Sequence, residues 1–129
     1  MPSGEAFTAD QEREIGRACS VASAETGVHH TVYVGAVEGD VRDHAERLHA
    51  ALGTARAANA VLVFVAPGDR LLEIVTGKDS SRRVTDRACA LAALSMTTAF
   101  SGGNLTGGIV TGLRMLAESA GRALASGHS

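Results

Sequence analysis

A chain of 129 residues is long enough for one domain with a continuous hydrophobic core, without disulfides or a structural metal. Its formal charge of −2 argues against a general nucleic-acid-binding surface, and its 3% of aromatic residues, with no tryptophan, leave no platform for base stacking. The abundant alanine and glycine predict a core of small aliphatic side chains and closely approaching helices.

The first predicted elements are a helix and a strand. Thr8 and Gln11 have the spacing of a capping box, and the helix that they begin is expected to end at Gly27. Residues 30–37 are β-branched and aromatic enough for a strand. The N-terminal part of the chain is therefore expected to form an amphipathic helix followed by a strand.

A second helix and a β-hairpin follow. Asp40 is placed to begin the helix and Gly53 to end it. Residues 60–66 are apolar at every position, which predicts a strand buried on both faces, and the turn at residues 67–69 leads into a second strand with Glu73 on a wet side. The strand–helix–strand order predicts a parallel pair, and the hairpin adds an antiparallel strand, so the sheet is expected to be mixed.

Two helices are predicted after the hairpin. Residues 85–100 are apolar around nearly the whole circumference, which indicates either an interior helix or a partner surface. Asn104 is placed to cap the last helix. The inward stripe of that helix is expected to be Leu105, Ile109, Leu113, Leu116 and Ala120. A short edge strand at residues 56–59 or near the N-terminus stays open, because such a strand would lack enough periodicity to be detected.

These elements predict a single domain over residues 7–125, with flexible tails at residues 1–6 and 126–129. The expected fold class is α/β: a three-layer α/β/α sandwich, Rossmann-like, whose mixed sheet has a βαβ unit followed by a β-hairpin and two C-terminal helices. Cys19 and Cys89 lack metal or redox spacing and are expected to be buried reduced thiols.

The N-terminus has no leader-like pattern, and the sequence has no apolar run of membrane length. We therefore expect no membrane span and a cytoplasmic location. Membrane association is the alternative if an anchor has been removed from the chain.

The loop after the hairpin is a candidate contact surface for an anionic ligand or an acidic partner, through Lys78, Arg82 and Arg83. A solvated loop with helix-capping serines is the competing interpretation, and it is favoured. Residues 101–108 could present backbone N–H groups to an anion, but a turn with close helix packing is favoured because neither phosphate-binding glycine pattern is complete. No nucleophile elbow or activated cysteine is present, so no catalytic residue is predicted.

Several segments occur together in an order and spacing that identify a resemblance. They are Phe7-Thr8 at the start of a helix, residues 24–27 (AETG), residues 59–65 (NAVLVFV) with Asp69-Arg70, and residues 100–108 (FSGGNLTGG). Together they resemble the TPM domain family, most closely its short actinobacterial branch of unknown function, over residues 7–121. The resemblance implies a Rossmann-like α/β/α sandwich, and functions that range from acid phosphatase to assembly or modulation of membrane complexes.

Some TPM relatives bind calcium or other divalent ions through acidic loops, which makes Ca²⁺ or another divalent ion a candidate cofactor. Asp40, Asp69 and Asp79 lie in loops that flank the predicted strands, and hard cations need several such oxygen ligands at one point. Many relatives have an acidic residue after the Phe-x-x-Gly turn, where this chain has Asn104. That departure weakens both the metal site and a phosphatase activity, and no metal is assigned.

The function predicted from the sequence is a noncatalytic protein-interaction or complex-assembly module for an unknown protein partner. The hairpin edge, the loop after it and the third helix are the expected contact surfaces. The alternative is a divalent-metal-dependent phosphatase, in which the three aspartates face the metal and Lys78 or Arg82 steadies the phosphate. A third hypothesis is a homo-oligomer formed through the apolar segment that begins at Ala88 and ends at Leu94.

Overall fold

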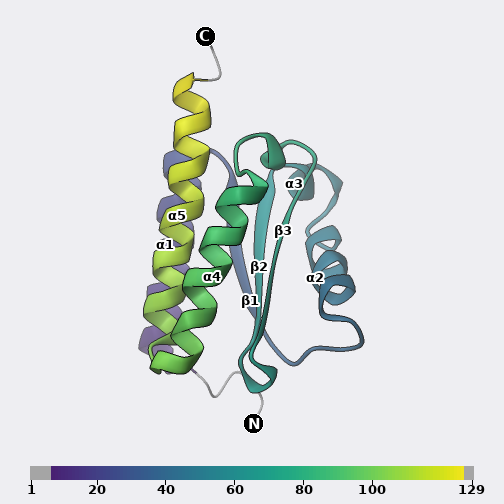
Figure 1. Cartoon of the computed structure of the whole chain (residues 1–129). Helices are drawn as coiled ribbons and strands as arrows, with labels where there is room; N and C mark the ends of the chain where they lie inside the picture. The colour runs from purple at the N-terminus through teal and green to yellow at the C-terminus, as the bar shows by residue number, and fades with distance from the viewer. Residues whose placement is uncertain (1–6, 127–129) are drawn as a thin grey trace.

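The computed structural model describes residues 7–126, which form a three-layer α/β/α sandwich around a mixed sheet (Figure 1). The sheet contains β1 (His29–Val34), β2 (Ala60–Ala66) and β3 (Leu71–Thr76), in the order β1-β2-β3. Strand β1 pairs with β2 in parallel, and β2 pairs with β3 in antiparallel orientation. The predicted α/β sandwich, the mixed sheet and the hairpin are confirmed.

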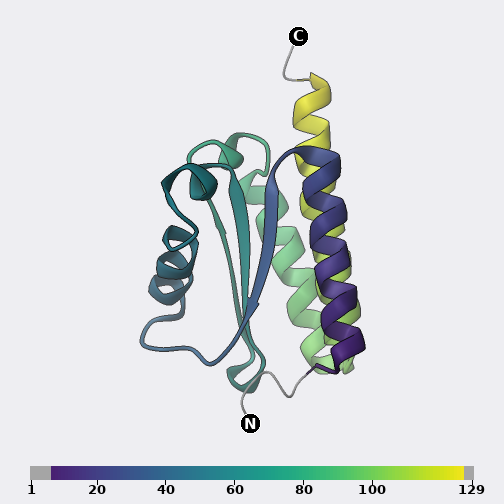
Figure 2. The ribbon, with the colours of Figure 1, turned by 180° about the vertical axis from the view of Figure 1, so that it is seen from behind.

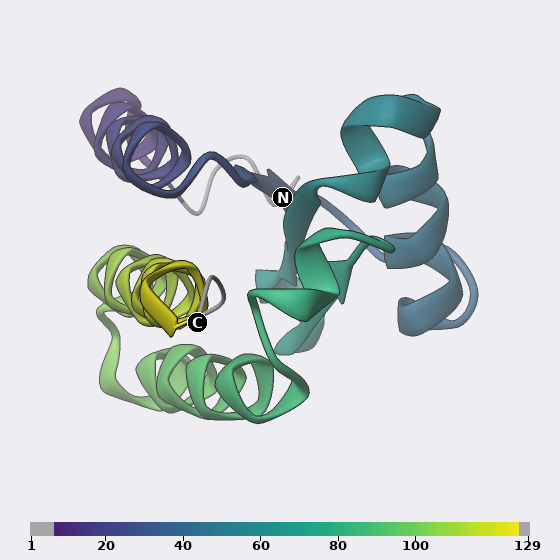
Figure 3. The same cartoon turned by 90° about the horizontal axis from the view of Figure 1, so that it is seen from above.

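The helices cover both faces of the sheet, as the view from behind and the view from above show (Figures 2 and 3). One face carries α1 (Ala9–Thr26), α4 (Asp86–Gly102) and α5 (Leu105–Ser126). The other face carries α2 (Val41–Ala50) and the short α3 (Thr54–Ala58). Helices α1 and α5 lie side by side and run in the same direction (Figures 1 and 2).

Strand β2 is buried along its whole length because its alternate side chains enter two different cores. The larger core lies beneath α1, α4 and α5 and contains Met96 and Leu113. The smaller core lies beneath α2 and contains Ala45. The larger core takes Val61, Val63 and Val65 from β2, and the smaller core takes Leu62, Phe64 and Ala66. The prediction that this strand is buried on both faces is confirmed.

Helix α1 also closes the outer edge of β1. The Ser23 hydroxyl oxygen accepts a 2.9 Å hydrogen bond from the backbone N–H of His30. The Cys19 thiol makes a hydrogen bond with the backbone of Val32. Burial raises the pKa of this thiol to about 11, and the hydrogen bond offsets part of that rise. An open strand edge is a template for pairing with another chain, so these side chains protect the sheet as well as positioning α1.

Arg42 ties α2 to β3 on the opposite side of the molecule. Its guanidinium donates a 2.9 Å hydrogen bond to the carbonyl oxygen of Ile74 and a 3.1 Å bond to the Glu73 carboxylate. A further bond of 3.0 Å reaches Glu46, one turn along the same helix. Glu73 on β3 is thus partly exposed, as predicted, and its charge is paired.

The first strand and the second helix are shorter than the sequence analysis predicts. Strand β1 ends at Val34 instead of residue 37. The N–H of Gly35 donates the last hydrogen bond to β2, at the carbonyl oxygen of Val65, and β2 ends one residue later. Helix α2 ends at Ala50, because a separate turn and the short α3 occupy the residues around Gly53.

The alternative of an edge strand at residues 56–59 is wrong. This segment belongs to α3 and its C-cap, Asn59, whose side-chain amide donates a 2.7 Å hydrogen bond to the carbonyl oxygen of Gly27. Of the predicted tails, residues 1–6 and 127–129 lie outside the described residues, while Ser126 is the last residue of α5.

Small residues bring α4 and α5 close together, as the alanine- and glycine-rich composition predicts. A Cβ at Gly108 would lie 2.4 Å from the Cβ of Ala99, and a Cβ at Gly112 would lie 2.0 Å from the terminal methyl of Met96. Neither glycine has room for a larger side chain without a shift of its neighbour. The two helices therefore pack through glycine surfaces, with Met96 filling the space that the glycines leave.

Substitution of Gly77 is expected to destabilise the protein. A Cβ at this position would lie 1.9 Å from the carbonyl oxygen of Ala57 and 2.7 Å from that of Ala58, and backbone atoms cannot move aside as a flexible side chain can. We expect Gly77→Ala to lower the free energy of unfolding by about 1–3 kcal/mol. Gly68→Ala is the control, since nothing lies within 4 Å of a Cβ there. Urea denaturation measures both, and equal stabilities would contradict the packing described.

Removal of the Ser23 hydroxyl is expected to leave the buried N–H of His30 without its acceptor. We expect Ser23→Ala to lower the free energy of unfolding by about 1–3 kcal/mol, the penalty for an unsatisfied buried donor. Ser20→Ala removes the same group from an exposed position of the same helix and should have little effect. Amide hydrogen exchange at His30 should accelerate only in the Ser23 variant; unchanged exchange would show that α1 does not close this edge.

Candidate functional site

The three aspartates proposed from the sequence do not converge. Asp40 is the N-cap of α2 and accepts a hydrogen bond from a backbone N–H of that helix. Asp69 lies in the 3-10 turn η2 (Pro67–Asp69), beyond the end of β2, whereas the N–H of Asp79 bonds to Ala58, just before β2 begins. Asp69 and Asp79 are therefore separated by the length of a strand, about 20 Å. Residues 7–126 contain no group of three or more His, Cys, Asp or Glu side chains that could hold a metal ion.

Asn104 has a structural role at the turn between α4 and α5. Its side-chain oxygen accepts a 3.2 Å hydrogen bond from the backbone N–H of Gly107 in the first turn of α5. Gly103 has a φ of 77°, the left-handed conformation that favours glycine where a helix ends. The glycine-rich segment at residues 101–108 is thus a helix end, a cap and a helix start, as the favoured interpretation predicts.

The three cations of the loop after the hairpin have different environments. Lys78 and Arg82 are exposed, beside and within the 3-10 turn η3 (Ser80–Arg82). The guanidinium of Arg83 instead donates bonds of 3.3 and 3.4 Å to the carbonyl oxygen of Ala120, and the Ser119 hydroxyl donates back to the carbonyl oxygen of Arg83 at 2.9 Å. Arg83 therefore fastens the loop to α5, while Lys78 and Arg82 remain on the surface.

Helix α4 is partly interior and partly exposed, so the interior-helix interpretation of its apolar sequence holds for one face, and the partner surface stays a prediction for the other. Ala88, Ala92 and Met96 are buried against the rest of the domain. Leu91 and Leu94 are 45% and 64% exposed. The segment that begins at Ala88 and ends at Leu94 therefore presents a narrow apolar stripe to solvent.

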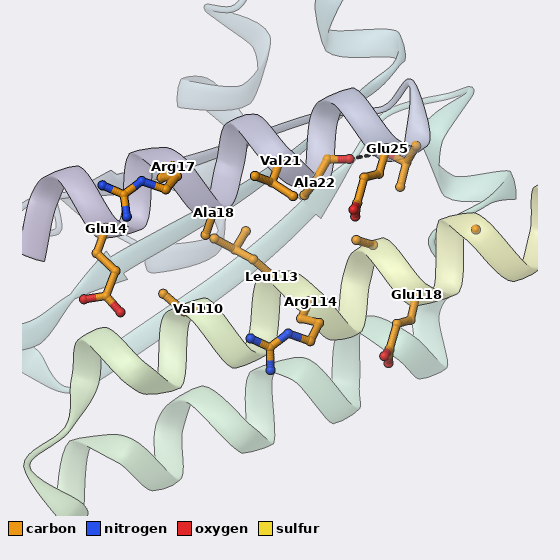
Figure 4. Close-up of a pocket in the computed structure, with 13 residues that line it drawn as sticks. Glu14, Arg17, Ala18, Val21, Ala22, Glu25, Val110, Leu113, Arg114 and Glu118 are labelled. Atoms are coloured by element: carbon orange, nitrogen blue, oxygen red, sulfur yellow. Dashed lines mark hydrogen bonds between the residues drawn. The ribbon is translucent and has the colours of Figure 1, made fainter.

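A hollow that was not predicted from the sequence lies between α1 and α5. We call it the α1–α5 groove; its volume is about 610 Å³. Its floor is apolar, and Val21 at its centre is 49% exposed (Figure 4). The floor residues are Ala18, Val21, Ala22, Val110, Leu113, Ala117 and Gly121.

Charged side chains form the lips of the α1–α5 groove on both helices (Figure 4). Along α1 the order is Glu14, Arg17 and then Glu25, and along α5 it is Arg114 and then Glu118. Because the two helices run in the same direction, Glu25 and Glu118 lie at the same end of the groove, and Glu14 and Arg17 lie at the other end (Figure 4). The groove thus combines an apolar floor with charged lips on both helices.

His30 is a buried polar residue that the groove does not use. It is 2% exposed, and its Nδ1 lies 2.7 Å from the carbonyl oxygen of Val28, so Nδ1 carries the donated hydrogen. Its Nε2 has no hydrogen-bond partner among the described residues. Burial lowers the pKa of His30, and the nearby cationic groups of His29 and Arg83 lower it further, so the ring is neutral in the folded protein at neutral pH.

The fold and the groove define an α/β/α sandwich with a helix-lined surface cleft. The chain belongs to the family described as "Domain of unknown function (DUF5130)", whose sequence profile matches residues 1–117. Among the described residues, no helix combines the length and the apolar character needed to cross a membrane.

Solved bacterial structures share this fold. The BA42 protein from the psychrophilic bacterium Bizionia argentinensis is 26% identical, with a TM-score of 0.78 over 90% of this chain and 82% of that one. The N-terminal domain of a protein from P. gingivalis is 15% identical, with a TM-score of 0.77 over 92% and 79% of the two chains. The N-terminal domain of cg2496 from Corynebacterium glutamicum is 19% identical, with a TM-score of 0.65 over 91% and 73%. The last two similarities concern the fold alone.

The buried His30 ring makes stability depend on pH in one direction. Since its folded-state pKa is lowered from 6.5, the unfolded chain binds the proton more readily, and the free energy of unfolding should fall as the pH drops below about 6.5. We expect His30→Leu to show a shallower fall, because the titrating ring and its unpartnered Nε2 are both gone. Urea denaturation between pH 7.5 and 5 measures the two slopes; identical slopes would show that His30 does not titrate as described.

Proposed function

We propose that this chain is a noncatalytic protein-interaction domain of the TPM type and that its partner binds in the α1–α5 groove. The observation that carries the proposal is the open apolar floor around Val21, held between two long helices and bordered by charges on both sides. A partner that removes exposed apolar surface of this kind from water gains a favourable free energy of binding. The resemblance to the TPM family supports an assembly role, because some members of that family act in membrane complexes.

The geometry favours a helical ligand. A third amphipathic helix can lie between two parallel helices and place one apolar stripe on the floor of the groove. The lips favour a ligand with acidic side chains near Arg17 and Arg114 and basic side chains near Glu25 and Glu118. The apolar floor would supply affinity, and the charges would set the direction in which the ligand lies.

The phosphatase alternative gains no support from a specific arrangement of residues 7–126. Its three aspartates lie on separate turns, and Asn104 is engaged in capping α5.

The free thiols Cys19 and Cys89, with pKa values raised to about 11 mainly by burial, favour a reducing compartment such as the cytoplasm as part of the same proposal.

A designed helical peptide tests whether the groove binds protein. The probe has a leucine stripe, glutamates near one end and arginines near the other, and carries a fluorescent label for anisotropy titration. We expect Val21→Glu to weaken binding at least about tenfold, because the new carboxylate would be buried without a partner on the apolar floor. Binding that is equal for the wild-type protein and this variant would contradict the assignment of the groove.

The matched controls use the exposed face of α4 and a polar peptide. Leu94→Glu introduces the same charge at a residue that is 64% exposed and does not line the groove, so peptide affinity should be unchanged. A peptide with serines in place of its leucines should not bind, since it retains the charges but lacks the apolar stripe. Circular dichroism before each titration establishes that the variants are folded.

A further inference from the structure

We propose that His30 controls the attachment of α1 to the sheet in response to pH: the helix is docked while the ring is neutral and leaves β1 when the ring takes up a proton. Release of α1 would expose the outer edge of β1 and dismantle the α1–α5 groove. This control acts in the free protein and goes beyond the proposed function, because it does not depend on the ligand that the groove binds.

The backbone around His30 is bonded to the C-terminal end of α1. The Ser23 hydroxyl oxygen accepts the 2.9 Å hydrogen bond from the N–H of His30, and the Thr26 hydroxyl oxygen accepts one of 3.1 Å from the N–H of Val28. Thr26 also lines the groove, and α1 turns directly into β1 at this end of the molecule (Figure 2). The side chains that hold this end of α1 therefore bond the same short stretch of backbone that carries the His30 ring.

The docked structure has no place for a second proton on the His30 ring. The residue is 2% exposed, its Nδ1 donates to the carbonyl oxygen of Val28 at 2.7 Å, and its Nε2 has no partner among the residues that the structure describes. Protonation would create an N–H at Nε2 without an acceptor and a positive charge without a counter-ion, and both are costly away from water. The protonated ring therefore favours a form in which water reaches Nε2.

The charged groups around the His30 ring oppose its protonation. Burial lowers the pKa of His30, and two cationic groups lower it further: His29 on β1 and Arg83 on the loop before α4. Glu25 on α1 and Glu118 on α5 line the groove at this end but are not among the groups that set the pKa of the ring. No acidic side chain thus compensates for the proton within residues 7–126.

Helix α1 is the covering element that is released at the lowest cost. Strand β1 is held along its length by the parallel ladder with β2, and Arg83 fastens its own loop to α5. Helix α1 is instead joined to β1 by side-chain bonds, and its half-exposed Val21 faces the groove. It can therefore leave the sheet without breaking a strand ladder.

The sign of the pH dependence follows from the two forms of His30. Once α1 is released, water reaches the ring and its pKa returns towards about 6.5, whereas the docked form has a lower pKa. Release therefore takes up a proton, and its equilibrium constant rises as the pH falls below about 6.5, by at most about tenfold per pH unit. Above that pH the docked form retains its full stability. The groove is thus assembled at neutral pH and loosens in acid.

Amide hydrogen exchange of the free protein at low urea concentrations tests this control. The amide of His30 reports release of α1, and the amide of Val63 in the buried strand β2 reports opening of the whole domain. We expect the His30 amide to open with a smaller free energy and a weaker urea dependence than the Val63 amide. Its protection, relative to the unstructured chain at the same pH, should be about threefold to tenfold lower at pH 5.5 than at pH 7.5.

Two variants without a titrating ring separate His30 from other groups. His30→Asn keeps a side-chain donor close to the position of Nδ1, and His30→Leu removes all polar atoms; either should abolish the effect of pH on protection at position 30. His44→Asn is the matched control, because His44 packs against Phe64 beneath the opposite face of the sheet, with ring centroids 4.8 Å apart. It should retain the effect. Circular dichroism establishes that each variant is folded.

Three results would overturn the inference. The first is an equal free energy and urea dependence of opening at the His30 and Val63 amides, since α1 would then leave only when the whole domain unfolds. The second is protection at His30 that does not change with pH. The third is a pH effect that persists in His30→Asn and His30→Leu.

The designed peptide decides the proposed function separately. A ligand in the groove binds only the docked form, so saturating peptide should raise protection at the His30 amide at pH 7.5. If the peptide leaves protection unchanged while the pH effect is present in the free protein, the proposed function fails and the control by His30 stands. If the peptide raises protection but pH has no effect, the groove binds its ligand without this control.

Discussion

The burial of β2 on both faces is the constraint on which the rest of the structure depends. A strand whose every side chain is apolar must be covered from two directions, so the domain needs helices on both sides of a sheet with only three strands. Helix α2 meets this need on one face, and α1, α4 and α5 meet it on the other. The glycine contacts of α5 with Ala99 and Met96 allow the helices of the crowded face to approach closely.

A sheet this narrow has two edge strands, and the helices also have to protect them. Ser23 and Cys19 make hydrogen bonds with the backbone of β1, so α1 lies along a strand edge as well as over the sheet. This placement sets the distance and angle at which α1 meets α5. The groove between them is the result: α1 is held by the β1 edge on one side, and its exposed Val21 side remains only partly covered by α5.

Much of the fold could be predicted because local signals coincide with it. Thr8 and Gly27 bound α1, the turn after Ala66 separates two strands, and Asn104 begins α5. The short α3 could not be predicted, because a five-residue helix has no periodicity and depends on neighbours such as Gly77 and Asn59. Local patterns place elements well only where the pattern is longer than a turn.

The groove could not be predicted for a different reason. The sequence analysis recovers the apolar stripe of α5, since Ile109, Leu113, Leu116 and Ala120 are buried. It gives no indication that α1 and α5 become neighbours, because they stand at opposite ends of the chain. The sequence pattern indicates ordinary surface residues of a single helix at Val21, Arg17 and Glu25. Only the packing of the second helix beside them creates an apolar floor with charged lips.

The wide separation of α1 and α5 in the chain has a consequence for folding and for local opening. The β2–β3 hairpin and the α4–α5 pair join segments that are adjacent in sequence, whereas the contact of α1 with α5 closes the longest loop in the domain, which is entropically costly and slow. We therefore expect the docking of α1 to be a late step in folding. Release of α1 would expose the β1 edge and abolish the groove at the same time. A ligand held between the two helices binds only the docked form and so stabilises it by mass action. Occupancy of the groove and protection of the β1 edge are thus linked through one equilibrium, the attachment of a single helix.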